Sequence, residues 1–195
     1  MEKNTVIVGA VLLIVGIGVG YGLWGNAPAA PADGHMMSDG SMMGQNIDQH
    51  FIVQMIPHHE GAIVMAKIAL ERSKRPEVLT LANGIIKAQE REIADMRGWY
   101  QSWYGGAVPQ SGMGMMHMGG MTGEPDVLTS VPLTDFDREF INEMIPHHEM
   151  AVMMAQMLAS GTERSEMKQL ASNIIESQSS EIEMMRGWIK TWSAQ

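Results

Sequence analysis

Residues Asp48–Ala66 read DQHFIVQMIPHHEGAIVMA, and 89 positions later residues Asp137–Ala155 read DREFINEMIPHHEMAVMMA. The same shift relates QEREIADMRGW, which begins at Gln89, to QSSEIEMMRGW, which begins at Gln178. The alignment between the two units needs no gap. A duplication of this length indicates two copies of one structural unit, each of which needs the other to bury its apolar side chains.

Each unit is predicted to consist of two helices. Apolar residues recur every three or four positions in both parts of the unit, which is typical of a helix with one buried face. In the first part of the first unit this face includes Phe51, Ile52, Met55, His59, Ala62, Ala66 and Leu70. In the second part it includes Ala82, Ile85, Ile86, Gln89, Ile93, Met96, Tyr100 and Trp103.

The ends of these helices are predicted from capping and turn residues. Asp48 and Asp137, or Thr134, are candidate N-caps. Turns near Ser73–Pro76 and Gly161–Thr162 would fold each unit into a helical hairpin. Pro57 and Pro146 lie inside the helical pattern, and we expect each to kink its helix just before the histidines.

The fold class predicted from these features is all-α, a four-helix bundle made of two duplicated hairpins. The hairpins are expected at residues 47–103 and 134–195, so that 47–195 form one domain. Each hairpin has an apolar face that it cannot bury alone, and packing the two faces together resolves this.

An N-terminal membrane segment is predicted to precede the bundle. Residues Thr5–Trp24 carry no charge, and a helix of about 20 residues spans the hydrocarbon layer of a membrane. Residues 1–25 are therefore interpreted as a membrane anchor, although the small residues Ala27–Ala32 also fit a cleaved signal peptide. Either reading places the rest of the chain in the periplasm or on the outer face of the cytoplasmic membrane.

Composition excludes several functional classes. The chain has 13 Lys and Arg against 22 Asp and Glu, a formal net charge of −9, and an acidic chain is repelled by nucleic acid. With no cysteine it has no disulfide, zinc finger, iron–sulfur cluster or thiol nucleophile. The sequence also contains no specific serine hydrolase motif and no phosphate-binding glycine loop.

Methionine is the unusual residue, with 21 in 195 positions. Residues 26–46 and 104–133 are predicted as flexible segments that contain HMMSDGSMMG and MGMMHMGGM. Thioether sulfur is a soft, neutral ligand that suits Cu(I) and Ag(I), and imidazole is a second ligand that copper accepts. The candidate metal ligands of these tracts are His35, Met36, Met37, Met42, Met43, Met113, Met115, Met116, His117, Met118 and Met121.

The histidine pairs of the two MIPHHE motifs are candidate ligands inside the bundle. Neighbouring residues on a helix point about 100° apart, so we expect only one histidine of each pair, His59 and His148, to point inward. A structural alternative is that buried neutral histidines form hydrogen bonds to Gln89 or Gln178. The repetition of Met, Pro, His, His and Glu in both units favours a ligand role.

These motifs, together with the later Q-x-x-E-I-x-x-M-R-x-W segments, resemble the bacterial family catalogued as domain of unknown function 305. The resemblance covers residues 46–192 and implies a ferritin-like four-helix bundle outside the cytoplasm that binds Cu(I) and Ag(I). A copper exporter or acceptor protein would then be a partner. The ligands that the resemblance implies are Met55, His58, His59, Met65, Met96, Met144, His147, His148, Met154 and Met185.

The function predicted from the sequence is to sequester, buffer or deliver copper, without enzymatic turnover. One alternative is a di-iron oxidase, which requires Glu from two helices and Glu-x-x-His from the other two. Here Glu60 and Glu149 directly follow the histidine pairs, so that spacing is missing. The other alternative is a membrane-anchored interaction module whose methionines form an adaptable apolar surface.

Overall fold

The computed structural model describes residues 39–109 and 125–192. The described part is all-helical and contains no strand, which confirms the predicted all-α class. Its five helices are α1 (Asp39–Arg72), α2 (Pro76–Tyr104), α3 (Pro125–Ser130), α4 (Phe136–Gly161) and α5 (Ser165–Trp192).

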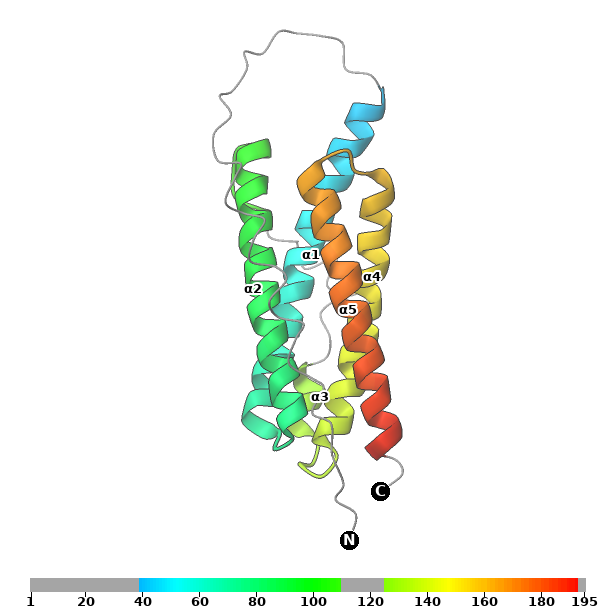
Figure 1. The fold of residues 1–195 in the computed structure, drawn as a ribbon. Helices are drawn as coiled ribbons and strands as arrows, with labels where there is room; N and C mark the ends of the chain where they lie inside the picture. Colours follow the sequence, from blue (N-terminus) through cyan, green and yellow to red (C-terminus); the bar gives the residue numbers. More distant parts are fainter. Residues whose placement is uncertain (1–38, 110–124, 193–195) are drawn as a thin grey trace, which may run out of the picture. The chain divides into compact units, whose positions relative to one another are not determined.

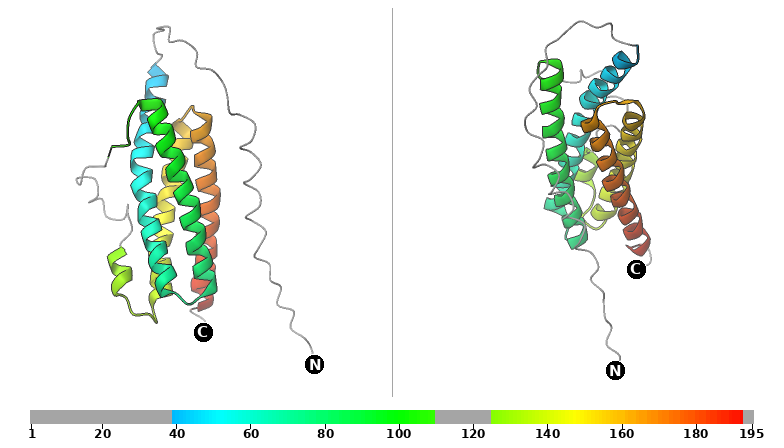
Figure 2. Two further views of the ribbon diagram at one scale, coloured as in Figure 1. Left: turned by 90° about the vertical axis from the view of Figure 1, so that its left-hand side faces the viewer. Right: turned by 45° about the horizontal axis from the view of Figure 1, so that its top comes forward.

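The four long helices lie side by side, with the short α3 near one end (Figures 1 and 2). Helix α1 packs against α2, α4 packs against α5, and the α1–α4 contact joins the two hairpins. The turns between paired helices fall at residues 73–75 and 162–164, as the sequence predicts. At the end of α2, Gly105 adopts a positive φ of 70°, which glycine tolerates best, and its N–H bonds to the carbonyl of Gln101.

Several helix boundaries differ from the prediction. Helix α1 already includes Asp48, which therefore does not cap it, and the residue before α4 is Asp135 rather than Thr134 or Asp137. Pro57 and Pro146 lie inside α1 and α4, as the sequence predicts. Asp48 lies inside α1, where it is buried and pairs with Arg164 from the other hairpin.

Helix α3 lies within the stretch predicted as a flexible connection, residues 104–133. Its Leu128 is fully buried in the core. The guanidinium of Arg72, at the end of α1, donates hydrogen bonds to the carbonyls of Leu128 and Val131. Packing and these charge-assisted bonds hold a six-residue helix that has no pattern of its own in the sequence.

The predicted membrane segment, residues 5–24, lies outside the described residues. Among the helices of residues 39–109 and 125–192, none combines the length and the apolar character needed to cross a membrane.

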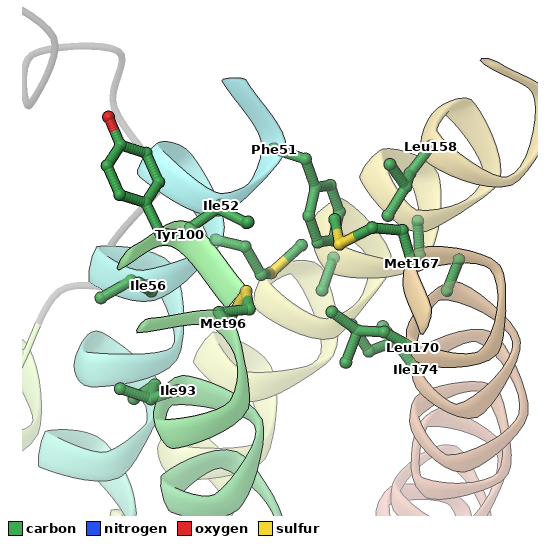
Figure 3. Packing of buried hydrophobic residues seen from close by; sticks show 14 of the residues in the cluster. Phe51, Ile52, Ile56, Ile93, Met96, Tyr100, Leu158, Met167, Leu170 and Ile174 are labelled. Carbon is green, nitrogen blue, oxygen red and sulfur yellow. The ribbon is translucent and has the colours of Figure 1, made fainter. Parts of the chain in front are cut away.

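The core consists of two apolar clusters, one toward each end of the bundle. The first combines the early part of α1 with the late parts of α2 and α4 and the early part of α5; Figure 3 shows Phe51, Tyr100, Leu158 and Met167 within it. The second contains Phe136, Phe140 and Leu81, among others. Since early α1 meets late α4, these two helices run antiparallel and bring the two MIPHHE motifs opposite each other.

The duplication gives matching contacts between the hairpins. Arg164 lies 3.3 Å from the carboxylate of Asp48, and its guanidinium stacks 4.1 Å from the ring centroid of Trp103. At the other end, the equivalent Arg75 lies 3.3 Å from Asp137 and stacks on Trp192. Each arginine therefore ties its own hairpin to the other one.

We expect Arg164→Gln to lower the free energy of unfolding by about 3 kcal/mol, because it leaves a buried carboxylate without its ion partner. Asp48 is only 1% exposed, and burial already raises the pKa of its carboxyl. The matched control is Arg75→Gln, whose partner Asp137 is 21% exposed, so a smaller loss of about 1 kcal/mol is expected. Urea unfolding measures both, and equal losses would contradict a role for the burial of Asp48.

Candidate metal centre

Four imidazoles form a layer between the two apolar clusters. His58, His59, His147 and His148 are each at most 1% exposed. The rings of His58 and His147 meet across the α1–α4 interface, with centroids 3.7 Å apart and planes inclined by 39°. Within each motif the two ring centroids are 6.2 and 6.3 Å apart. We call these four residues the histidine layer.

The expectation that only His59 and His148 point inward is wrong, since all four rings are buried. Each motif helix packs mainly against two long helices, its hairpin partner and the motif helix of the other hairpin, and also contacts the short α3. Two side chains about 100° apart can therefore both be covered. His58 and His147 occupy the interface between α1 and α4, whereas His59 and His148 face α2 and α5.

Carboxylates hold the outer pair of histidines. The Nε2 atom of His59 lies 2.7 Å from Oε2 of Glu92, and Nε2 of His148 lies 2.7 Å from Oε2 of Glu181. The glutamines proposed from the sequence as partners do not fill this role. A carboxylate on one ring nitrogen orients the imidazole and leaves the other nitrogen for a metal, an arrangement frequent in metalloproteins.

Sequence reasoning missed Glu92 and Glu181 as members of the site. Each lies three residues after the buried glutamine of its unit, on the same helical face, and the pair is related by the 89-residue shift. The equivalent positions were therefore visible in the repeat alignment. Whether each glutamate reaches a histidine depends on how the two helices of its hairpin pack together. The repeat alignment does not show this packing.

Six buried imidazole nitrogens in this layer have no hydrogen-bond partner. They are both ring nitrogens of His58 and of His147, and Nδ1 of His59 and of His148. A buried polar atom without a partner costs about 1–3 kcal/mol, so a cluster of them calls for an explanation. In a neutral imidazole one ring nitrogen carries a proton and the other a lone pair, so the four rings offer at most four lone pairs. Lone pairs held together in a buried layer suit a bound cation, and the residues present therefore fit a metal.

Burial keeps the two central imidazoles neutral. Burial, together with the neighbouring His59 and His148, lowers the pKa of His58 from 6.5 to about 3. The pKa of His147 is lowered well below its ordinary value by the same causes. The ring of each lies near the main chain of the other, which opposes the shift slightly without forming a hydrogen bond. Neutral imidazole is the form that binds metals, so these groups need no deprotonation at neutral pH.

Buried thioethers flank the histidine layer on both sides. Met55 and Met96 belong to the first apolar cluster, and the half-buried Met154 packs against it. Met65, Met144 and Met185 belong to the second cluster. Each side thus combines two methionines of one hairpin with one of the other, and all six were among the ligands implied by the family resemblance. Methionines here also fill the core.

The ligands predicted in the methionine tracts are not part of this layer. His35, Met36, Met37, Met113, Met115, Met116, His117, Met118 and Met121 lie outside the described residues, and for Met42 and Met43 only the helical backbone of α1 is described. Within residues 39–109 and 125–192, no three His, Asp or Glu side chains are grouped to hold a metal ion. Donors in this part of the chain must therefore include methionine sulfur if three or more ligands are needed.

The family match follows the same boundaries as the duplication. The model of the family described as Domain of unknown function (DUF305) matches residues 48–193. The structure of CopM in the Cu(II)-bound form is 50% identical, with a TM-score of 0.70, over 74% of this chain and 97% of that chain. CopM in the Cu(I)-bound form is 48% identical, with a TM-score of 0.66, over 74% of this chain and 96% of that one. CopM has also been solved in Ag-bound form.

More distant relatives share the fold and part of the sequence. A DUF305 fragment from Deinococcus radiodurans is 28% identical, with a TM-score of 0.66, over 74% of this chain and 96% of that chain. The uncharacterized protein L153 of Acanthamoeba polyphaga mimivirus is 45% identical over 49 residues. That match covers 25% of this chain and 32% of the viral protein, so the chain spans about a third of this relative's length.

Proposed function

The chain belongs to the DUF305 family, and on this premise we propose that it is an extracytoplasmic protein that binds Cu(I) and Ag(I) through methionine and histidine and thereby sequesters, buffers or delivers copper. Its likeness to CopM, solved with copper and with silver, supports a copper-related role. The observation that carries the proposal is the histidine layer, in which six unpaired buried nitrogens lie between two groups of thioethers.

The chemistry of these donors favours a monovalent soft ion. Thioether sulfur and neutral imidazole carry no charge, so a monovalent cation is bound without the carboxylates that hard divalent ions prefer. Glu92 and Glu181 would act on the metal indirectly, by orienting His59 and His148. Their negative charges would also partly compensate the charge of a bound ion.

The proposed function is metal binding without enzymatic turnover, and it gives roles to the methionine tracts and to the N-terminal segment. The methionine tracts would capture ions, and the bundle would hold them between α1 and α4. We place this function in the periplasm or on the outer face of the cytoplasmic membrane, with residues 5–24 as anchor or signal segment. A copper exporter or acceptor is the expected protein partner.

An anaerobic competition titration with Cu(I) tests the proposal. The full chain is expected to take up Cu(I), and replacing Met55, Met96, Met144 and Met185 by leucine is expected to lower its affinity at least about 10-fold. Methionine-to-leucine exchange conserves volume, so each site should lose less than about 1.5 kcal/mol of stability. Deleting residues 113–121 is expected to lower the number of bound ions and leave the affinity of the buried site unchanged.

The control is Met167→Leu. Met167 is fully buried in the first cluster, but its repeat counterpart is Val78, so packing alone explains it. This variant is expected to bind Cu(I) as the unmodified chain does. A full chain that takes up neither Cu(I) nor Ag(I) under reducing conditions would refute the proposed function.

A further inference from the structure

Exposed methionines distinguish the second hairpin. In the described part of the chain five large apolar side chains are exposed, and three of them are Met153 (49%), Met157 (63%) and Met184 (41%). Met153 and Met157 lie on α4, where the partly buried Met150 precedes Met153 by one turn and Met157 by two. An exposed apolar side chain contributes no burial free energy to folding. Core packing therefore does not explain these exposed methionines.

The spacing places three of these thioethers on one face of α4. Met150, Met153 and Met157 follow each other by three and four residues, and at 100° per residue they span about 60° of the helix circumference. Side chains at these spacings are neighbours, with Cβ atoms about 5–6 Å apart. Met150 and Met157 lie about 10 Å apart along the helix axis, with Met153 between them. Methionine rotates about three side-chain bonds, so an ion bound near Met153 is within reach of sulfurs from both sides.

The duplicated unit serves as an internal reference for this face. The residues 89 positions earlier are Gly61, Val64 and Ile68, none of which carries sulfur, and Val64 is also exposed. The same helical face is thus built without methionine in the first hairpin. Folding of the unit does not require sulfur there, and the three methionines belong to the second hairpin alone.

Further donors lead from this face into the bundle. Met154 lies one turn after Met150, is half-buried, and packs against the first apolar cluster. His147, with both ring nitrogens buried and unpaired, lies three residues before Met150. Along α4 the donors therefore form a series that begins in solvent and ends in the histidine layer.

We propose that Met150, Met153 and Met157, the α4 methionine surface, bind one Cu(I) or Ag(I) ion in a second, solvent-facing site and pass it through Met154 to the histidine layer. The transfer exchanges one neutral ligand for another, so the ion keeps its charge and oxidation state. This inference rests on the proposed function, because it supplies the route by which the buried site is loaded.

The test uses the full chain with 13C-labelled methionine methyl groups and Ag(I), which is not redox-active under these conditions. The methyl resonances of Met150, Met153 and Met157 are expected to shift during the titration. The variant Met150→Leu/Met153→Leu/Met157→Leu is expected to bind one ion fewer and to load the histidine layer at least about 10-fold more slowly, with its final affinity unchanged. The control Met184→Leu, an exposed methionine on α5, should behave like the unmodified chain.

The outcomes separate this inference from the proposed function. If the resonances of Met55 and Met144 shift while those of the α4 methionine surface do not, the surface site is wrong and the buried site stands. Loss of one ion in Met184→Leu as well would mean that any exposed methionine binds, which overturns the assignment to α4. If no methionine resonance moves, both proposals fail.

Discussion

Replacing His58 and His147 by leucine is expected to weaken Cu(I) binding about 100-fold or more, the scale of losing metal ligands and their supporting contacts. The same change removes four of the six unpaired buried nitrogens. Each such atom costs about 1–3 kcal/mol in the metal-free protein. We therefore expect the double variant to lose Cu(I) binding while its metal-free form is as stable as the unmodified chain or more stable. Removing residues with a purely structural role would lower the stability instead.

Two measurements check this double variant. Anaerobic Cu(I) competition gives the affinity, and thermal unfolding of the metal-free protein is expected to show a melting temperature that is unchanged or raised by about 4 °C. His50→Leu is the matched control, because His50 is exposed on the same helix and its repeat counterpart is Glu139. A double variant that unfolds more easily and still binds Cu(I) tightly would assign these histidines to packing.

Acidification is expected to destabilise the metal-free protein through the same two residues. Burial lowers the folded-state pKa of His58 from 6.5 to about 3, and that of His147 shifts in the same direction. Below pH 6.5 the unfolded chain takes up protons that the folded chain excludes, so stability is full above this pH and decreases as the pH falls. Between pH 7 and pH 5, His58 alone should account for a loss of about 2 kcal/mol.

Urea unfolding of the metal-free protein at pH 7, 6 and 5 measures this loss. The variant with leucine at positions 58 and 147 cannot take up these protons, so its stability should change much less over the same range. The buried carboxyl of Asp48 does not explain a loss of stability at low pH. Burial raises its pKa in the folded state, so the folded protein takes up this proton more readily than the unfolded chain. Acidification therefore stabilises the folded state at Asp48. Equal pH dependence in both proteins would contradict the assignment to His58 and His147.

The repeat and its periodicity were sufficient to predict the four long helices and their pairing into hairpins. The turns at residues 73–75 and 162–164 lie where proline, glycine and threonine mark them. Most apolar residues assigned to the helical faces are buried, including Met55, Met96 and Tyr100. These are local properties, because a helix presents the same face whatever covers it. Helix α3 has no such pattern, and only its contacts with Arg72 and the core reveal it.

By itself the sequence determined that two identical motifs, each with adjacent histidines and a methionine one turn earlier, occur on buried helical faces. Tertiary structure decided that these motifs meet. Periodicity gives the direction of a side chain on its own helix and carries no information on which helix lies opposite. The antiparallel contact of α1 with α4 places His58 against His147, and hairpin pairing places Glu92 beside His59 and Glu181 beside His148.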